Sequence, residues 1–306
     1  MQNGTAQHYE KLNNEEISNH HIARTPEQGA LDVWKMGGGA IGIWGGSSYF
    51  DSFKTIYNGN TTDGHGGAIN IGRVNSSAGN YFYTSASASV SKAEFTNNSG
   101  SMGGAVINNS TSNFLSESNL FKGNAAASGG AIFNGALSNN SDEVALNEKE
   151  TLLTLKGTNN FEGNTANNWG GAIVNQDAII RDTVASKNSF HGNSVTIDRY
   201  GLGGALVNIT QYKSTANSIV EFIGTVEFIS NSSVYGGANI SRDVPSEENF
   251  KTSMTFKGTT LFQNNQALGS SGGAIWNADA QLEFLGTQEF IGNSAKYGWG
   301  GAIASF

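Results

Sequence analysis

Three aspartates share one position relative to a repeated triplet and are the best acid–base candidates in the chain. Asp177, Asp243 and Asp279 each follow the first glycine of a Gly-Gly-Ala triplet by seven residues. Enzymes that cleave polysaccharides need such carboxylates gathered on one outer face. Other copies of the triplet carry different residues at this position, namely Ser110, Ala136 and Thr210. The line of acids is therefore broken, and solvated turn residues are the favoured interpretation.

The other residues with chemical potential are scattered. Arg181, Asp182, Asp198 and Arg199 form a second weak cluster, again more typical of turns. Asp63 and His65 share a glycine-rich turn without a nearby serine motif such as GxSxG. The remaining histidines follow no ligand spacing: His8, His20, His21 and His191. Cysteine is absent, which excludes disulfides, thiolate zinc sites and a cysteine nucleophile. We expect no catalytic residue, no metal site and no cofactor.

Composition limits the classes of partner. The net charge is −8 and no basic patch is present, so nucleic acid is not an expected partner. Charged residues make up 14% of the chain, against roughly 25% in ordinary soluble domains. The 17 Phe, 9 Tyr and 5 Trp can nevertheless build a core. The N-terminus shows no signal-peptide pattern, and no run approaches the ~18 apolar residues of a membrane helix.

An internal repeat dominates the sequence. The Gly-Gly-Ala triplet begins at Gly38, Gly66, Gly103, Gly129, Gly170, Gly203, Gly236, Gly272 and Gly300. An aromatic residue followed three positions later by Asn precedes eight of these triplets. These pairs are Tyr57/Asn60, Phe95/Asn98, Phe121/Asn124, Phe161/Asn164, Phe190/Asn193, Phe228/Asn231, Phe262/Asn265 and Phe290/Asn293. Repeats of this length are typical of solenoids, in which each copy buries its apolar face only by stacking on its neighbours.

The pattern within each copy predicts strands. Residues 153–161, 220–228, 254–262 and 282–290 align without gaps and alternate apolar with other residues on both sides of Gly-Thr. We therefore expect three short strands per copy and a single-stranded, right-handed parallel β-helix of about nine coils. The expected domains are a polar N-terminal arm or cap over 1–30, with a short helix at 15–21, and the repeat domain over 31–306.

Each repeated residue receives an expected structural role. The aromatic residue should stack inside the coil, and the Asn should turn the chain and bond its equivalents as a ladder. The paired glycines should supply unusual backbone angles and room for close contact between coils. Counted from the first glycine, the fourth residue is aliphatic in every copy except at Asn239 and is assigned inward. The fifth residue is assigned outward, which predicts an exposed, partly apolar face: Asn70, Ile107, Phe133, Val174, Val207 and Trp276. This face is either an interaction surface or a surface that packs against a loop or an absent domain.

The GGA[ILV] and FxxN tetrapeptides, paired in this order, resemble the chlamydial polymorphic outer-membrane protein repeat. The resemblance covers roughly residues 38–306 and is carried by Phe95, Asn98, Gly103, Gly104, Phe121, Asn124, Gly129, Gly130, Phe161, Asn164, Gly170, Gly171, Phe228, Asn231, Gly236, Gly237, Phe262, Asn265, Gly272, Gly273, Phe290, Asn293, Gly300 and Gly301. It implies an autotransporter passenger displayed on the outer membrane or secreted, acting as an adhesin. No barrel is recognised, and the chain stops inside a repeat, so we expect it to be truncated at the C-terminus.

Three functions remain open. The preferred one is an adhesin-like passenger that binds a host-cell or neighbouring-cell surface protein or glycan through an extended face and loops. Its expected contact with a membrane runs only through a missing C-terminal barrel or another anchor. The loops are expected where the repeat is interrupted, at 138–151, 193–202 and 241–253. The alternatives are a polysaccharide-acting β-helix enzyme and a purely structural surface stalk.

Overall fold

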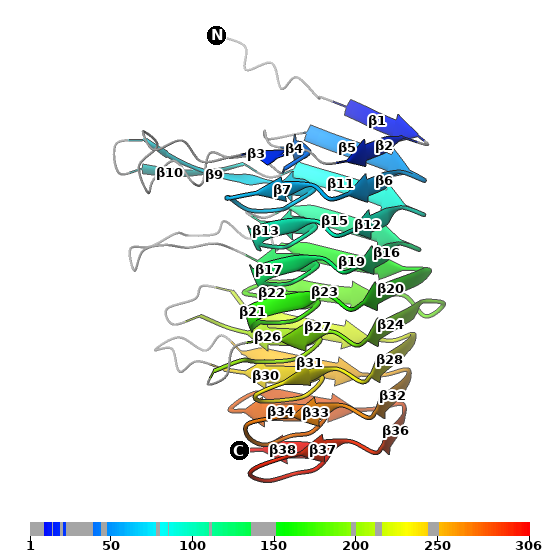
Figure 1. The fold of residues 1–306 in the computed structure, drawn as a ribbon, viewed down its shortest axis with the longest axis vertical. Helices are drawn as coiled ribbons and strands as arrows, with labels where there is room; N and C mark the ends of the chain where they lie inside the picture. The colour runs from blue at the N-terminus through cyan, green and yellow to red at the C-terminus, as the bar shows by residue number, and fades with distance from the viewer. Residues whose placement is uncertain are drawn as a thin grey trace.

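The computed structural model shows an all-β solenoid. It describes residues 9–13, 15–18, 21–22, 39–43, 48–77, 80–84, 86–109, 112–135, 151–196, 200–211, 216–243 and 251–306. Four parallel sheets of nine strands each run the length of the molecule, and each coil contributes one strand to each sheet. Figure 1 shows the coils stacked from the N-terminal end to the C-terminal end. The predicted parallel β-helix of about nine coils is confirmed, whereas its right-handedness stays a prediction.

The sheets are named A to D in the order in which the chain visits them. Sheet A contains β1 (Tyr9–Asn13), β5 (Ser48–Phe53), β11 (Ala86–Ser91), β15 (Asn113–Glu117), β19 (Leu152–Lys156), β23 (Ile179–Asp182), β27 (Ser218–Phe222), β31 (Thr252–Phe256) and β35 (Gln281–Phe284). Sheet B contains β2 (Glu16–Ser18), β6 (Ile56–Asn58), β12 (Glu94–Thr96), β16 (Leu120–Lys122), β20 (Thr158–Glu162), β24 (Lys187–His191), β28 (Thr225–Ile229), β32 (Thr259–Gln263) and β36 (Thr287–Ile291).

The other two sheets complete each coil. Sheet C contains β3 (His21–Ile22), β7 (Thr61–Thr62), β13 (Ser99–Met102), β17 (Ala125–Ser128), β21 (Thr165–Trp169), β25 (Ser194–Val195), β29 (Ser232–Ser233), β33 (Gln266–Ala267) and β37 (Ser294–Ala295). Sheet D contains β4 (Ile41–Ile43), β8 (Ile69–Ile71), β14 (Val106–Asn108), β18 (Ile132–Gly135), β22 (Ile173–Gln176), β26 (Leu206–Ile209), β30 (Asn239–Arg242), β34 (Ile275–Ala278) and β38 (Ile303–Ser305).

Two expectations about the strands are wrong. Each coil has four strands rather than three, because sheet C was not recognised. Several of its strands are only two residues long, such as Ser232–Ser233, which is too short for an alternating pattern to show. The helix expected at 15–21 is also wrong, since β2 and β3 lie there and pair in parallel with β6 and β7. The described residues within 1–30 therefore extend the sheets.

The repeated aromatic residue forms the predicted stack inside the solenoid. From Tyr57 to Phe290, each ring lies 4.6–5.0 Å from the equivalent ring of the next coil, at interplanar angles of 3–12°. This spacing matches the distance between hydrogen-bonded strands. The stack therefore fixes the register of sheet B along the whole molecule.

The repeated asparagine forms the predicted ladder at the corner between sheets B and C. At Asn164, the backbone N–H and the side-chain Nδ2 both donate to Oδ1 of Asn193, at 3.0 and 2.9 Å. Nδ2 also donates to the carbonyl oxygen of Phe121 in the preceding coil, at 2.9 Å. The same three bonds recur at every ladder asparagine from Asn98 to Asn265. Each coil is thereby tied to both neighbours.

The paired glycines form the corner between sheets C and D, as predicted. The first glycine has a left-handed φ, for example +59° at Gly170. A Cβ on the second glycine, Gly171, would lie 2.1 Å from the carbonyl oxygen of Gly204 in the next coil. No side chain fits there, so the pair is required both by its backbone angle and by close packing between coils.

The prediction of an exposed apolar face on sheet D is wrong. The inward position is buried as expected, but the next residue along the chain is buried too, as at Val174, which is 0% exposed. A second hydrophobic cluster contains Ile107, Phe133, Val174, Val207 and Ile240 from this outward position, together with Leu202 and Ile209. Met102, Trp169, Tyr235 and Trp276 pack against it. Leu202 of this cluster and the adjoining Trp169 and Tyr235 each immediately precede a Gly-Gly corner, and parallel bridges join Trp169 to Leu202 and Leu202 to Tyr235.

Candidate functional site: the insertion edge

The four corners of the coil differ in how much extra chain they accept. From β6 onward, two residues separate every sheet B strand from the sheet C strand that follows it. Between sheets D and A, the connection instead varies from the short turns at 177–178 and 279–280 to the long stretch at 136–151. Long connections at this corner also span 72–85, 210–217 and 243–251. We call this corner the insertion edge, because stacking of the coils places the ends of all these connections along one side of the solenoid.

The corner between sheets C and D lies between these two extremes. From β7 onward, its connections range from the bare triplet at 103–105 to the longer stretch at 196–205. Each of them ends on the Gly-Gly-Ala triplet, which packs closely against the next coil. The longest connections, and the widest range of lengths, therefore belong to the insertion edge.

A second asparagine series closes the base of the insertion edge. These residues lie near the ends of sheet D strands and bond each other from coil to coil: Asn108 to Asn134, Asn134 to Asn175, and Asn175 to Asn208, at 2.7–2.8 Å. Each also donates Nδ2 to a carbonyl oxygen of the returning chain in sheet A or just before it. Asn134 bonds Ile179 at 3.0 Å, and Asn208 bonds Ser253 at 2.8 Å. Each of these sheet A strands is thus held by an asparagine of an earlier coil, whether the connection before the strand is short, as at 177–178, or long, as at 243–251.

One insertion contains a hairpin that the sequence reasoning missed. Within 72–85, strands β9 (Arg73–Ser77) and β10 (Asn80–Thr84) pair antiparallel to each other and outside the four main sheets. Figure 1 shows this hairpin projecting sideways from the stacked coils. The β-prone run Tyr-Phe-Tyr, preceded by Ser-Ala-Gly-Asn, was the available signal. The loops expected at 138–151, 193–202 and 241–253 lie only partly within the described residues, and the first lies there only at Thr151.

The structure places all three candidate aspartates at the insertion edge, in register on the turns that follow β22, β30 and β34. The backbone N–H of each donates to the coil that follows, with acceptors Ile209, Ala278 and Phe306. Asp177 and Asp279 have φ of +51° and +52°, an angle that Asp tolerates better than most residues. The sequence-based register match is thus reproduced in space.

The three carboxylates have different surroundings and do not meet at one point. Asp177 is buried and accepts a hydrogen bond from the backbone N–H of Gln211 at 3.0 Å. Oδ1 of Asp243 accepts from the hydroxyl of Thr210 at 2.7 Å. Asp279 is exposed. Among the described residues, no three His, Asp or Glu side chains are grouped so that they could hold a metal ion.

The two described members of the second weak cluster, Arg181 and Asp182, do not meet on the surface. Asp182 is buried at the corner between sheets A and B, where its carboxylate accepts from the backbone N–H groups of Ile223 and Gly224 and from Nδ2 of Asn188. Burial raises the pKa of Asp182 to about 6, although these three bonds oppose the rise. Arg181 instead lies on the outer face and pairs with Glu221 at 3.6 Å. Asp198 and Arg199 lie outside the described residues.

His65 is a structural residue. Its ring is 6% exposed, and Nδ1 lies 2.8 Å from the hydroxyl of Ser101 in the next coil. Burial lowers the pKa of His65 to about 4, so the ring is neutral at physiological pH. His8 and His20 lie outside the described residues, as do the side chain of His21 and Gly38 of the first triplet.

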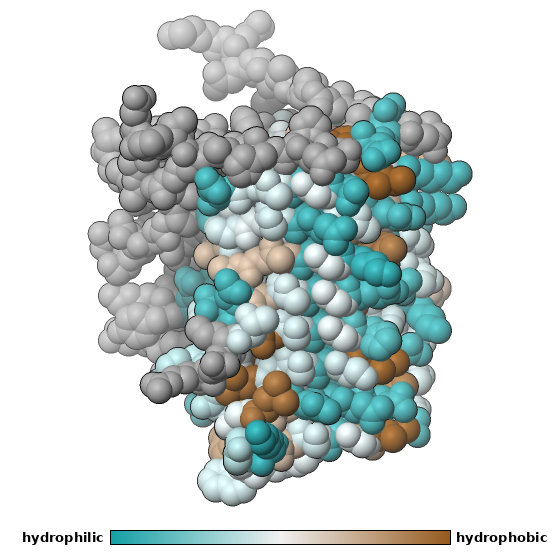
Figure 2. Space-filling view, viewed as in Figure 1, coloured by the Kyte–Doolittle hydropathy of each residue, from teal (hydrophilic) through white to brown (hydrophobic). Residues whose placement is uncertain are grey.

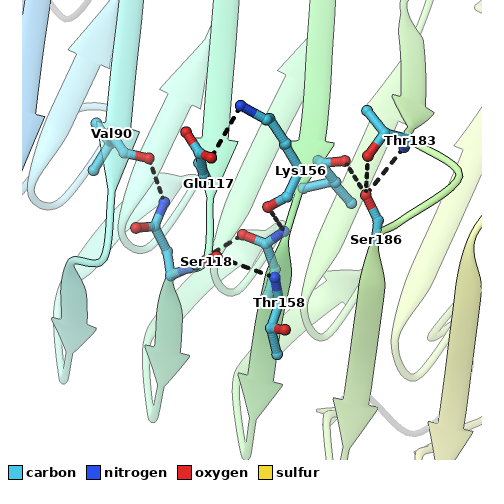
Figure 3. Close-up of polar contacts among 10 residues, drawn as sticks. Val90, Glu117, Ser118, Lys156, Thr158, Thr183 and Ser186 are labelled. Carbon is cyan, nitrogen blue, oxygen red and sulfur yellow. Dashed lines mark hydrogen bonds and ion pairs between the residues drawn. The ribbon is translucent and has the colours of Figure 1, made fainter.

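The corner between sheets A and B shows a further arrangement, in which side chains cap the turn (Figure 3). The Asn119 side chain donates to the carbonyl oxygen of Val90 at 2.8 Å, and the hydroxyl of Ser118 accepts from the N–H of Thr158 at 3.2 Å. Cross-strand ion pairs such as Lys156–Glu117, at 3.0 Å, lie on the outer face beside this corner. On the side of the molecule seen in Figure 2, the described residues are mostly hydrophilic and neutral, with hydrophobic side chains largely in separate spots.

The fold and the edge define a class: a parallel β-helix solenoid with uniform walls and one edge that carries the longest insertions. Comparison with protein families identifies its repeat. Residues 160–176 and 259–278 match the model of the Chlamydia polymorphic membrane protein repeat. The chain is thus a β-helix protein that carries this repeat. Comparison with curated proteins and with solved structures finds no match. No helix among the described residues is long and apolar enough to cross a membrane.

Proposed function

We propose that the protein is an adhesin-like passenger that binds a protein or glycan on a host or neighbouring cell through its insertion edge. The observation that carries this proposal is the gathering of the longest and most variable connections at one corner. The ladder corner keeps one length from β6 onward, whereas the insertion edge presents a projecting hairpin and several long connections on a rigid base. Recognition residues commonly lie on loops that a rigid scaffold positions.

The repeat supports a location at the cell surface. Proteins with the Chlamydia polymorphic membrane protein repeat are named as membrane proteins, and we infer display on the outer membrane or release from it. In this role the coils act as a spacer and a platform, and no bond is made or broken. We therefore propose that the protein is not an enzyme.

Binding to cells tests the proposal directly. The fluorescently labelled chain is incubated with epithelial cells and, separately, with a glycan array and a library of cell-surface ectodomains. A variant replaces 72–85 with a two-residue turn like that at 177–178, and a second variant carries Glu162→Ala and Glu227→Ala on the outer face of sheet B. We expect at least a tenfold loss of binding in the first variant and none in the second. Equal binding by all three proteins would contradict a role for this insertion, and no binding by the wild type would favour a structural stalk.

A second candidate function rests on the acids of the insertion edge. Asp243 and Asp279 occupy equivalent positions on adjacent coils, which places their backbones about 4.8 Å apart. Retaining glycosidases hold two carboxyl groups about 5–5.5 Å apart. A screen for polysaccharide cleavage, with the Asp177→Ala/Asp243→Ala/Asp279→Ala variant as control, decides the matter. Turnover by the wild type that the variant lacks would establish the enzyme.

A further inference from the structure

The second asparagine series is interrupted at one coil. Ser241 occupies the position that pairs in register with Asn208 on one side and Asn277 on the other. Elsewhere in the series, as from Asn134 to Asn175, Nδ2 of one residue donates directly to Oδ1 of the next. The Ser241 hydroxyl makes no such bond. Within the described part of the chain, Oγ of Ser241 and Oδ1 of Asn277 are both buried without a hydrogen-bond partner.

A second unpartnered group lies beside the first. Asn239 is on the same strand, two residues before Ser241 and on the same inward face, in the column that holds Leu206 and Ile275 in the adjacent coils. Its side chain is 0% exposed, and neither Nδ2 nor Oδ1 has a partner among the described residues. Because both atoms lack a partner, flipping the amide to exchange its oxygen and nitrogen does not satisfy it.

The chemistry of these atoms selects the ligand. The two amide oxygens, of Asn239 and Asn277, need hydrogen-bond donors, whereas Nδ2 of Asn239 needs an acceptor. A cation would satisfy only the oxygens, and an apolar filling would satisfy none of these atoms. Water both donates and accepts, and buried waters characteristically bridge polar groups of this kind. Leaving these atoms unpaired would carry the full desolvation cost of each buried polar group.

We propose that the interior of the solenoid binds structural water at Ser241. One molecule bridges the Ser241 hydroxyl and Oδ1 of Asn277, in the place that an asparagine amide takes in the other coils. Further water satisfies the Asn239 amide on the same strand. Serine plus water thus continues the second asparagine series through the coil that carries the insertion at 243–251.

A high-resolution crystal structure of the whole chain, in which buried solvent is visible, tests the proposal. We expect ordered solvent within about 3.2 Å of both Ser241 Oγ and Asn277 Oδ1, a distance typical of hydrogen bonds. Direct contact between Oγ of Ser241 and Oδ1 of Asn277, or an empty apolar space in a map that shows other buried waters, would overturn it.

The variant Ser241→Asn gives an independent test. If water fills the place of an amide, the new side chain fits and completes the series, so the water disappears and Tm rises by about 2 °C. The matched control is Ser253→Asn, which makes the same change at a half-buried, outward-facing position of the strand that begins the following coil and should leave Tm unchanged. A fall in Tm of Ser241→Asn below that of the control would show that no room for water exists.

Discussion

The ladder corner and the insertion edge are both built on asparagine, yet they respond oppositely to changes in chain length. At the ladder corner, the backbone N–H and the side chain of each Asn bond the next coil, so the position of the main chain itself is specified. At the insertion edge, the side chain of each Asn reaches across to a sheet A strand, and the number of residues in the connection varies from coil to coil. A main-chain bond fixes the register of every coil, whereas a side-chain bond closes the base of a loop of any length.

Inserting extra residues should reveal the largest difference in stability between the two corners. A Gly-Ser-Gly-Ser insertion between Glu162 and Gly163 displaces Asn164 from its bonds with both neighbouring coils, and we expect no cooperative unfolding transition. The same insertion between Asp177 and Ala178 lengthens a connection whose length already varies from coil to coil, and it should cost about 1 kcal/mol. Thermal unfolding followed by circular dichroism distinguishes the two. Equal loss at both sites would show that the corners do not differ.

Removing one ladder amide should have the next largest effect. Asn164→Leu deletes the acceptor for the backbone N–H and the amide of Asn124 and leaves the carbonyl oxygen of Phe121 without its donor. Several buried groups at roughly 1–3 kcal/mol each give an expected loss of about 3–5 kcal/mol in the free energy of unfolding. Asn167→Leu is the control, since Asn167 is exposed in the same coil. Urea denaturation measures both, and a loss below about 1 kcal/mol at Asn164 would refute the account.

The corner between sheets A and B provides an intermediate case that depends on pH. The folded pKa of Asp182, about 6, lies above the ordinary aspartate value of 3.8. The native state therefore binds more protons than the unfolded state between these values. The contribution of the protonated Asp182 to the free energy of unfolding is fully present below pH 3.8 and is lost as pH rises through 6.

Comparison of wild type with Asp182→Asn between pH 4 and pH 7 isolates this contribution. Wild type should lose about 1–2 kcal/mol of stability relative to the variant over this interval. Urea unfolding at each pH gives the difference between the two proteins. A difference that stays constant across the interval would show that Asp182 does not titrate there.

The smallest effect is expected on the outer faces, which neither corner controls. Glu221 pairs with Arg181 and with Lys257 across three adjacent strands. These cations are about half exposed, so solvent weakens both pairs. Lys257→Ala should cost at most about 1 kcal/mol and less at high salt. A larger cost, or one independent of salt, would assign these pairs a structural role comparable to that of the ladders.

The sequence predicted well the features that recur in every coil. The aromatic stack, the Asn ladder and the Gly-Gly corner each depend on one residue type at a fixed position, and repetition makes such a signal visible. The sequence-based prediction failed where an element is very short or where burial depends on residues from another part of the chain. The two-residue strands of sheet C leave no alternation, and the burial of Val174 depends on Trp169 and Leu202, which reach it only after the coil has closed.

By itself, the sequence determined that this chain is a stacked β-helix, because no single copy can bury its own apolar side. Only the tertiary structure decided how the coil closes and which corner takes the longest insertions. Asp177, Asp243 and Asp279 already shared a position in the repeat, but stacking was needed to show that they lie beside the long connections. Likewise, Asp182 has a raised pKa only because its coil encloses it. Contacts between coils form only when the coils pack. The sequence predicts them where the repeat is unbroken, because equivalent residues then lie above one another.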